Sequence, residues 1–336
     1  MTKKEYCKAG AGAVAMAAVL ILGMAGPGFA ASSGKIVNLL TNPAGTGNYT
    51  ISVAQAQVIT KKTDIRVIVQ PTQGPVVIAD LLENGDGKAA TLSSMGTYWA
   101  YSGTGDYKKP YKFVRVLQSG NLNYFALVTR EDLGIKTISD LKGKRVTYFV
   151  TSLLTKDIID MELKAHNLDQ HKDITLLKAE STPRALNDLL QGRTDAVACS
   201  LGGAKMVEVN SKKKLLVLPF AADKVPFLRT RLPGMVAAVT PADRVGIPPG
   251  VPVVATPVLF IGVAGLDNAL AYGMVKGLIA NYSALKAINP ELAEWKPEAA
   301  VRDLPIPYHP GAIKYYKEQG LWNGDMDKLQ KSFVTK

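Results

Sequence analysis

The sequence predicts an α/β fold of two similar lobes, each with a mostly parallel sheet, and a cleft between the lobes. Short apolar runs typical of buried strands alternate with segments of helical period, beginning with residues 36–40 and 49–60. The same order returns in the second half, where residues 189–192 precede a strand as residues 81–85 do in the first half. Strands and helices that alternate through short links favour a mostly parallel sheet with helices on its faces.

The other elements follow from periodicity and turn residues along the chain. Further strands are expected over 64–70, 88–92, 113–118, 124–129, 145–150, 174–177, 194–199 and 253–264. Helices are expected over 76–83, within 131–144, and over 156–167, 183–191, 267–287, 291–296 and 310–318. Residues 98–111 are aromatic and glycine-rich without a clear period, so we expect a loop or an irregular helix there.

The long apolar stretch 253–264 is interpreted as a strand that crosses back from the second lobe to the first. Lobe 1 is therefore expected to hold residues 32–125 plus 256–336, and lobe 2 residues 126–255. The two connections between the lobes are predicted to act as a hinge about which the lobes close.

The first residues have the order of a secretory signal peptide. Lys3, Lys4 and Lys8 precede an apolar or small run over 9–25, and small residues continue to Ala30. We expect residues 1–31 to be a signal peptide cleaved near Ala30 and the mature protein to be periplasmic. An uncleaved membrane anchor is the alternative, and the short apolar run argues against it.

Charge and cysteine content exclude some classes of function. The net charge is +12, and loss of three Lys and one Glu with the signal peptide would leave about +10. Because the lysines are scattered and an exported protein rarely meets nucleic acid, we expect mild steering of anionic ligands and no nucleic-acid partner. Only Cys199 remains after cleavage, so no intrachain disulfide is possible, and a small buried residue is expected there. A monomer is expected.

Loops at the ends of several strands carry hydroxyls and small residues. Residues 41–48, between the first strand and its helix, are dense in turn formers. A helix N-terminus offers free N–H groups to an anion, and α/β folds bind ligands at the C-terminal ends of their strands. We therefore predict a site for a small anion in the cleft, with a satisfied turn hydroxyl as the alternative for any single residue. Its candidate ligand-binding residues are Gly45, Thr46, Gly47, Asn48, Tyr49, Thr72, Gly74, Ser93, Ser94, Ser152, Thr155, Arg184 and Ser200.

Three arginines are candidates for a carboxylate clamp, because the guanidinium group offers a planar bidentate fork. They are Arg115, Arg184 and Arg229. Arg184 is placed first because residues 181–183 begin its helix. Solvation at the surface is the alternative for each.

Motifs of catalysis and metal binding are absent from the sequence. It contains no Gly-x-Ser-x-Gly, His-Glu-x-x-His or Cys-x-x-Cys pattern. Residues 45–50 begin like a dinucleotide fingerprint but have Thr50 where the third glycine belongs. His166, His171 and His309 are far apart in the sequence, and a structural role is expected for His309. We therefore expect no enzyme, no cofactor and no metal.

Several stretches resemble the TAXI family, the solute receptors of TRAP transporters, within the two-lobed periplasmic binding proteins. Asp-Leu-Lys-Gly-Lys-Arg-Val at 140–146 is similar to a run common in such proteins, and Gln-Gly-Arg-Thr-Asp-Ala at 191–196 resembles their Gly-x-x-Asp-Ala element. Pro-Tyr-His-Pro-Gly-Ala at 307–312 and the run 315–320 are close to the TAXI C-terminal pattern, and residues 45–49 look like its first ligand loop. The resemblance implies a periplasmic-binding-protein-like fold, a TRAP-type membrane permease as partner, and a substrate of the glutamate or 2-oxoglutarate kind.

The predicted function is that of an extracytoplasmic solute receptor. It would bind a small organic anion, a carboxylate or acidic amino acid, by lobe closure and deliver it to a TRAP-type permease. A periplasmic ligand-binding protein that feeds a membrane sensor is the alternative among binding proteins. The rival class is an enzyme on the same fold, against which the missing constellation of acid, base and nucleophile counts.

Overall fold

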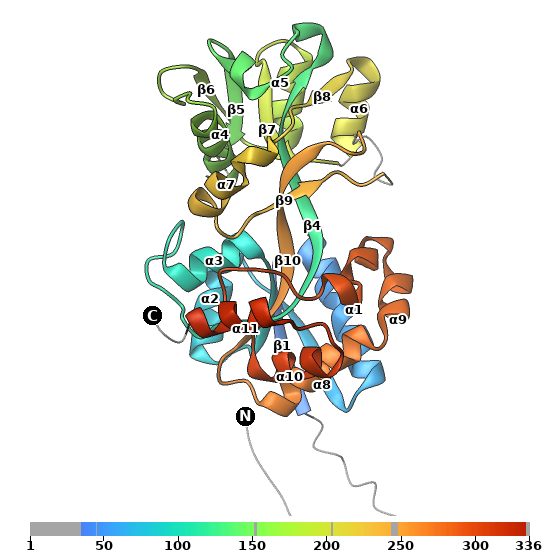
Figure 1. Ribbon diagram of the computed structural model, residues 1–336. Coiled ribbons are helices and arrows are strands. Elements are labelled where there is room, and N and C mark those ends of the chain that lie inside the picture. The colour runs from blue at the N-terminus through green and yellow to red at the C-terminus, as the bar shows by residue number, and fades with distance from the viewer. Residues whose placement is uncertain (1–34, 45, 151–152, 203, 243–247, 334–336) are drawn as a thin grey trace, which may run out of the picture. The chain divides into compact units, whose positions relative to one another are not determined.

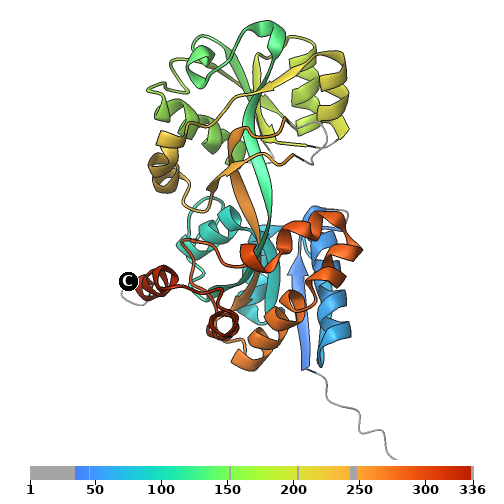
Figure 2. The same cartoon turned by 45° about the vertical axis from the view of Figure 1, so that its right-hand side comes forward.

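A mixed β-sheet of ten strands forms the centre of the protein. The computed structural model describes residues 35–44, 46–150, 153–202, 204–242 and 248–333, and Figures 1 and 2 show how their elements are arranged. The predicted signal peptide lies outside the described residues. Within the described ranges, no helix is long and apolar enough to cross a membrane.

The strands follow the order β2-β1-β3-β10-β4-β7-β5-β6, with β8 paired to β4 and β9 paired to β10. Their bounds are β1 Lys35–Thr41, β2 Ile65–Pro71, β3 Ala89–Ser93, β4 Val114–Arg130, β5 Arg145–Phe149, β6 Thr175–Ala179, β7 Ala196–Ser200, β8 Leu215–Val217, β9 Val236–Val239 and β10 Pro252–Val263.

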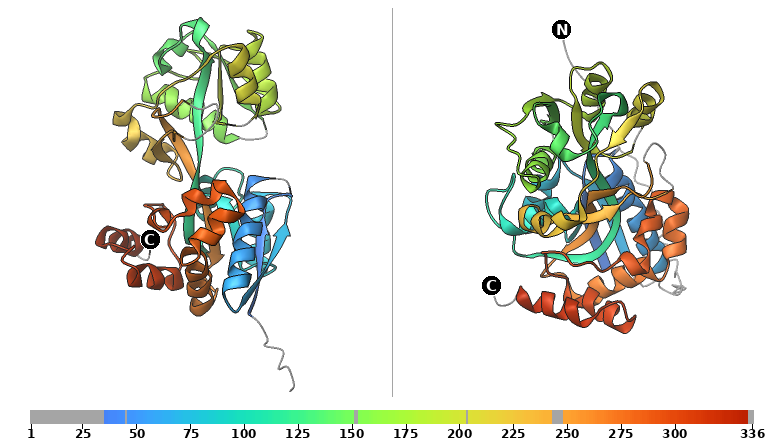
Figure 3. Two further views of the ribbon diagram at one scale, coloured as in Figure 1. Left: turned by 90° about the vertical axis from the view of Figure 1, so that its right-hand side faces the viewer. Right: turned by 45° about the horizontal axis from the view of Figure 1, so that its top comes forward.

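Helices lie on both faces of the sheet, as Figures 1 and 3 show. The α-helices are α1 Gly47–Lys62, α2 Pro75–Asn84, α3 Ser94–Ser102, α4 Leu153–Ala165, α5 Thr182–Leu190, α6 Ala204–Lys212, α7 Val225–Arg231, α8 Asn268–Ile279, α9 Tyr282–Ile288, α10 Pro310–Glu318 and α11 Gly324–Ser332. The 3₁₀ helices are η1 Glu131–Leu133, η2 Ile138–Leu141, η3 Ala222–Lys224, η4 Pro290–Trp295 and η5 Pro297–Ala299.

Parallel pairing occupies the two ends of the sheet, and antiparallel pairing its centre. Strand β1 pairs in parallel with β2 and β3, and β5 with β6 and β7. At the centre, β10 runs antiparallel to β3 and β4, and β4 runs antiparallel to β7. The predicted α/β fold is confirmed. Its two parallel groups belong to one continuous sheet, because β10 pairs with β3, β4 pairs with β7, and β10 and β4 pair with each other.

Among the described residues, three of the four buried apolar clusters belong to one or other of the parallel groups, and the fourth joins Met95 of α3 to residues within 154–254. The largest cluster draws its buried residues from 37–117 and 258–326, whereas two others draw theirs from within 124–255. Transfer of this apolar surface out of water is the main force that holds each group together. The clusters support the division into two lobes, and the lobe boundaries given above stay a prediction.

Some expected elements differ from the observed ones for local reasons. Strand β4 is one strand where two were expected, since the polar run 119–123 within it reads as a turn. The expected helix 267–287 is divided into α8 and α9 at Asn281, whose side-chain amide donates to the Gly277 carbonyl at 2.9 Å. Residues 94–102 form the regular helix α3, which ends at Gly103 with a φ of 73°.

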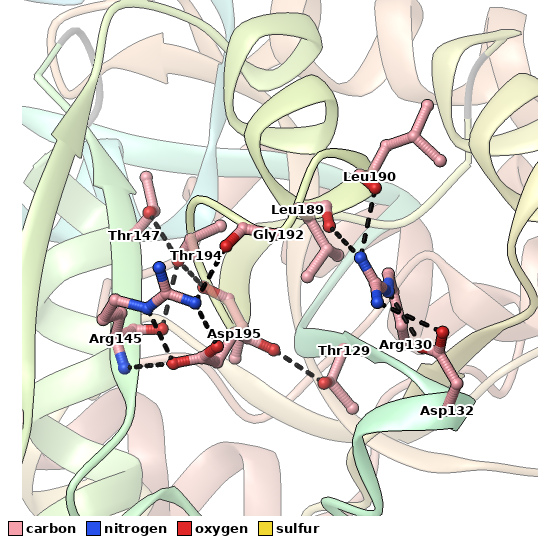
Figure 4. Close-up of polar contacts among 11 residues, drawn as sticks. Thr129, Arg130, Asp132, Arg145, Thr147, Leu189, Leu190, Gly192, Thr194 and Asp195 are labelled. Carbon is pink, nitrogen blue, oxygen red and sulfur yellow. Dashed lines mark hydrogen bonds and ion pairs between the residues drawn. The ribbon is translucent and has the colours of Figure 1, made fainter.

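The carboxyl end of α5 is tied to the neighbouring strands by two arginines. Arg145 donates from Nε and Nη2 to the Asp195 carboxylate, at 3.1 and 2.7 Å. Arg130 donates from Nη1 to the carbonyl oxygens of Leu189 and Leu190, both at 3.1 Å (Figure 4). The bonds from Arg130 satisfy carbonyl groups that the end of a helix leaves without intrahelical partners, whereas Arg145 holds the turn after α5 through the Asp195 carboxylate.

Candidate functional site

A pocket of about 430 Å³ lies where β4 and β10 pass the starts of several helices. Its size falls within the range of small-molecule sites. The residues that line it come from β4, β7, β10, the loop after β1 and the starts of α1, α3 and α4. They are Asn42, Thr46, Gly47, Asn48, Ile51, Ser93, Asn121, Asn123, Phe125, Leu154, Ser200 and Thr256.

The N-terminus of α1 forms one wall of the pocket. Thr46 is the N-cap: its Oγ1 accepts from the Tyr49 N–H at 3.4 Å and donates to the Pro43 carbonyl at 2.8 Å. Gly47 and Asn48 occupy the first turn, where backbone N–H groups have no intrahelical acceptor. The pocket therefore faces the positive end of the dipole of a 16-residue helix.

Two further helices begin at the same pocket. Ser93 is the N-cap of α3, and its Oγ accepts from the Gly96 N–H at 3.2 Å. Leu154 is the second residue of α4. Three helix N-termini thus contribute partial positive charge to one cavity, an arrangement suited to an anionic group.

The strand side of the pocket is set by the alternation of side chains along β4. Asn121, Asn123 and Phe125 are separated by two positions and so lie on one face of the strand. Thr256 of β10 is the register partner of Asn123 across the antiparallel pair, and its side chain lies on the same face. Thr256 is only 1% exposed, and no described group pairs with its hydroxyl.

Neutral polar groups dominate the lining. None of the described residues that line the pocket is charged. The Oδ1 atom of Asn42 is buried and finds no hydrogen-bond partner in the described part of the chain. Asn121, by contrast, is held in place, since the indole N–H of Trp295 donates to its Oδ1 at 2.9 Å. Buried polar groups without partners are rare in folded proteins, and such a group in a pocket is one that a ligand can satisfy.

Five of the sequence-predicted site residues line this pocket. They are Thr46, Gly47, Asn48, Ser93 and Ser200. Gly45 and Ser152 lie outside the described residues. Tyr49, on the first turn of α1, is half-buried and does not line the pocket.

The remaining predicted residues are engaged elsewhere, chiefly in turns. Thr72 donates from Oγ1 to the Thr41 carbonyl at 3.0 Å and accepts from the Gly74 N–H at 3.2 Å. Thr155 is buried and accepts from the Phe149 N–H at 3.1 Å. Gly74 itself has a φ of 138° and precedes α2, so its backbone conformation needs glycine. These contacts are those of satisfied turn residues.

Ser94 joins α3 to a distant loop instead of facing the pocket. Its hydroxyl donates to the Gly234 carbonyl, and the side chain is fully buried. The two residues are 140 positions apart in the sequence, so this contact could not be foreseen from local pattern.

The three candidate clamp arginines do not line the pocket either. Arg184 forms an ion pair with Asp188 at 3.4 Å and lines a separate cavity together with Val150 and Lys178. Arg115 donates to the carbonyl groups of Lys112 and Val114, and Arg229 pairs with Asp303. A carboxylate clamp by any of them stays a prediction.

The sequence analysis missed seven lining residues: Asn42, Ile51, Asn121, Asn123, Phe125, Leu154 and Thr256. Two signals in the sequence could have found some of them. Asn121 and Asn123 form an Asn-x-Asn pair between two apolar runs, and Thr256 interrupts an otherwise apolar strand. Polar residues spaced by two in a buried strand indicate a polar face within the core.

Groups that could carry catalysis or bind metal are not gathered in the described residues. No cluster of three or more His, Cys, Asp or Glu side chains able to hold a metal occurs among them. Cys199 is buried as expected, and burial raises the pKa of its thiol to about 12. His309 caps α10: its Nδ1 accepts from the Gly311 N–H at 3.1 Å, and its Nε2 lies 3.0 Å from the Leu266 carbonyl. His309 therefore has a structural role.

The protein is similar in fold to several solved proteins. A TctC solute-binding protein from Polaromonas is 16% identical over 90% of this chain and 97% of that one, with a TM-score of 0.50. A Xanthomonas citri protein solved bound to ATP is 10% identical over 88% and 98% of the two chains, also with a TM-score of 0.50. The periplasmic aliphatic sulphonate binding protein SsuA from Escherichia coli is 12% identical over 88% and 97%, with a TM-score of 0.47.

The mixed α/β sheet with helices on both faces thus has the fold of the periplasmic binding proteins. At the identities given above, the likeness to individual structures establishes the fold alone. The family is established separately: a model of the NMT1-like family matches residues 39–320, and the chain belongs to that family.

Proposed function

We propose that this protein is an extracytoplasmic receptor that binds a small organic anion in the pocket lined by Asn42, Thr46 and their neighbours. The observation that carries the proposal is that three helix N-termini meet at one cavity. The cavity lies beside β10 and β4, the two central strands of the sheet. Backbone N–H groups there can donate charge-assisted hydrogen bonds to a carboxylate, each worth about 1.5–3 kcal/mol.

The finer assignment is to the TAXI receptors, with a TRAP-type permease as partner and the periplasm as location. The sequence motifs at 45–49, 191–196 and 307–320 support it, and membership of the NMT1-like family is compatible with it. A neighbouring gene for a large multi-span permease would support transport, and a gene for a membrane sensor in its place would favour the sensing alternative.

Lobe closure is part of the proposal. The pocket takes residues from both parallel groups, with Asn48 and Ser93 on one side and Ser200 and Leu154 on the other. Ligand binding should therefore draw residues 32–125 plus 256–336 towards residues 126–255 and make the protein more compact. Small-angle scattering at saturating ligand would detect the change, and an unchanged radius of gyration would count against closure.

The site itself is tested by substitution at Gly47. A Cβ atom at this position has no neighbour within 4 Å, so Gly47→Val should fold normally while its side chain obstructs the pocket. Gly324→Val is a matched control, because Gly324 is also the first residue of a helix and also has open space around its Cβ. In thermal-shift and calorimetric screens of organic acids and amino acids, Gly324→Val should bind as the parent does and Gly47→Val should not. Equal binding by both variants would place the site elsewhere.

A further inference from the structure

We propose that this pocket selects a ligand that carries a single carboxylate and brings its own hydrogen-bond donors, and that it disfavours ligands with two carboxylates. This inference rests on the proposed function and narrows it. It replaces the 2-oxoglutarate or glutamate type of ligand with one such as a neutral amino acid or the monoamide of a dicarboxylic acid.

The first support is the charge of the lining. The twelve lining residues include no Lys, Arg or His, so positive potential comes only from the helix starts at Thr46, Ser93 and Leu154. A helix N-terminus is equivalent to about half an elementary charge, and its effect falls off within one turn. The three helix N-termini together can balance the charge of one carboxylate. A second carboxylate would lose its hydration without meeting a counter-charge.

The second support is the set of unpaired amides. The side chains of Asn42, Asn48 and Asn123 line the pocket, and none of these amides is paired within the described part of the chain. A primary amide carries two N–H donors and one acceptor oxygen. The oxygens are satisfied by N–H or O–H groups, which a carboxamide end of a ligand supplies and an ionised carboxylate end does not.

The third support is the fixed orientation of Asn121. The indole N–H of Trp295 can only donate, so the atom of Asn121 that it contacts must be the oxygen. The Asn121 NH₂ group is left without a partner among the described residues, and it belongs to a side chain that is 5% exposed and lines the pocket. Asn121 thus presents a donor of fixed direction to an acceptor on the ligand.

The packing of Trp295 shows how this orientation is maintained. The indole is fully buried and lies against Gly120, where an added Cβ would come within 2.0 Å of its Cε2 atom. Glycine therefore admits the ring next to the strand. Trp295 does not line the pocket, so it is a positioning residue that acts through Asn121.

Ile51, Phe125 and Leu154 supply the apolar part of the lining. They fit a short hydrocarbon body between the charged end of the ligand and its polar end. The complete ligand description is therefore one anionic group, a short apolar segment and a neutral polar end with donors.

Matched pairs of compounds test the charge preference directly. The purified protein would be titrated by calorimetry with L-glutamine and L-glutamate, L-asparagine and L-aspartate, and succinamate and succinate. We expect the amide member of at least one pair to bind at least about tenfold more tightly than its diacid, since the diacid leaves one buried charge unpaired. Equal or tighter binding of the diacids would overturn the inference and leave the proposed receptor function standing. Failure of all six compounds to bind would count against both.

A conservative variant tests the role of Asn121. Asn121→Asp keeps an oxygen for the Trp295 N–H but removes the donor, so binding of the preferred amide should weaken by about 10- to 100-fold. Asn323→Asp is the control: Asn323 caps α11 by accepting the Met326 N–H, which Asp does equally well, so binding should not change. Unchanged affinity in Asn121→Asp would overturn the assignment of this donor.

The positioning role of Trp295 requires a separate readout. Trp295→Phe removes the indole donor and leaves the pocket lining intact. In the protein that retains Asn121, this variant should bind the ligand more weakly than wild type. In the double variant Trp295→Phe, Asn121→Asp, the affinity should be no lower than in Asn121→Asp alone. Additive losses would show that Trp295 affects binding independently of Asn121 and is not its positioning residue.

Discussion

The carboxylate of Asp195 receives three hydrogen bonds from a single residue, Arg145. The Arg145 backbone N–H donates to Oδ2 at 2.8 Å, Nε donates to the same oxygen at 3.1 Å, and Nη2 donates to Oδ1 at 2.7 Å. Arg145 Nη2 also reaches the Gly192 carbonyl at 2.9 Å. One ion pair therefore joins the start of β5 to the turn that precedes β7 (Figure 4).

Removal of this pair should destabilise the protein. We expect Asp195→Asn to lower the free energy of unfolding by about 1–2 kcal/mol at neutral pH, because charge-assisted hydrogen bonds are lost at a half-exposed site. The hydrogen bonds from Arg145 lower the pKa of Asp195, so its contribution is present above the unfolded pKa of about 3.9 and is lost as the pH falls through the lower folded value. Urea denaturation should therefore show the gap between wild type and variant closing in acid. The exposed pair Asp325–Lys328 offers Asp325→Asn as a control with no measurable effect.

We expect the buried carboxyl group of Glu162 to give the free energy of unfolding a second dependence on pH. It is buried on α4, its Oε2 has no partner among the described residues, and burial raises its pKa to about 8. Because the folded state holds this proton and the unfolded state releases it near pH 4.3, the contribution of Glu162 to stability should fall by about 1.4 kcal/mol per pH unit between about pH 4.3 and 8.

Glu162→Gln imitates the protonated acid and should remove this slope. Urea denaturation across the range should show the variant becoming more stable than wild type as the pH rises. Glu208→Gln is the control, since Lys205 and Lys212 lower the pKa of the exposed Glu208 to about 2, and its slope should match wild type. A difference in stability between Glu162→Gln and wild type that stays constant from about pH 4.3 to 8 would contradict the prediction.

His309 should lower stability in mild acid. Burial lowers its pKa, and the neutral ring is needed because Nδ1 accepts the Gly311 N–H. The unfolded chain takes up a proton near pH 6.5, so the free energy of unfolding should decrease as the pH falls below about 6.5. His309→Asn retains a capping side chain and should show less of this decrease, at a constant cost of about 1 kcal/mol for the lost contact with Leu266.

Variants of two buried threonines, Thr256 and Thr41, can distinguish an effect on ligand binding from an effect on stability. Thr256 and Thr41 both have hydroxyls without partners in the described residues, but only Thr256 lines the pocket. Replacement of either by Val should leave the free energy of unfolding unchanged or raise it by up to about 1 kcal/mol, because an unpaired hydroxyl is removed. Only Thr256→Val should weaken binding of the preferred compound in calorimetry. Equal effects of the two variants on binding would show that Thr256 does not face the ligand.

Much of the fold could be predicted because local signals and the final structure agree. Residues 36–40, 65–70 and 310–318 all lie in elements of the expected type, where apolar period and turn residues indicate the same structure. The sequence predicts two strands in place of the long β4, because residues 119–123 are polar. The strand conformation of these residues depends on their pairing with β10. Helices α6, α7 and α11 were not expected, since each is short and packs only one or two residues deeply.

The candidate site could be predicted only on its loop side. Thr46, Gly47 and Ser93 lie next to helix starts, and capping patterns are local in sequence. Asn121 and Thr256 belong to the pocket only because β4 and β10 pair across 133 positions of sequence, as in the register Asn123–Thr256. A single sequence holds no record of such a pairing, which is decided by the packing of the whole sheet.

The position of β10 has a consequence for the order in which the chain can fold. Strand β3, at residues 89–93, pairs on one edge with β1 and on the other with residues 258–262 of β10. The main apolar cluster likewise combines residues 37–117 with 258–326. During synthesis, β3 therefore has no partner on its second edge until β10, at about three quarters of the chain, has been made. Such non-local pairing folds slowly, so the growing chain stays unfolded for longer, the condition in which a polypeptide can be threaded through a translocation channel.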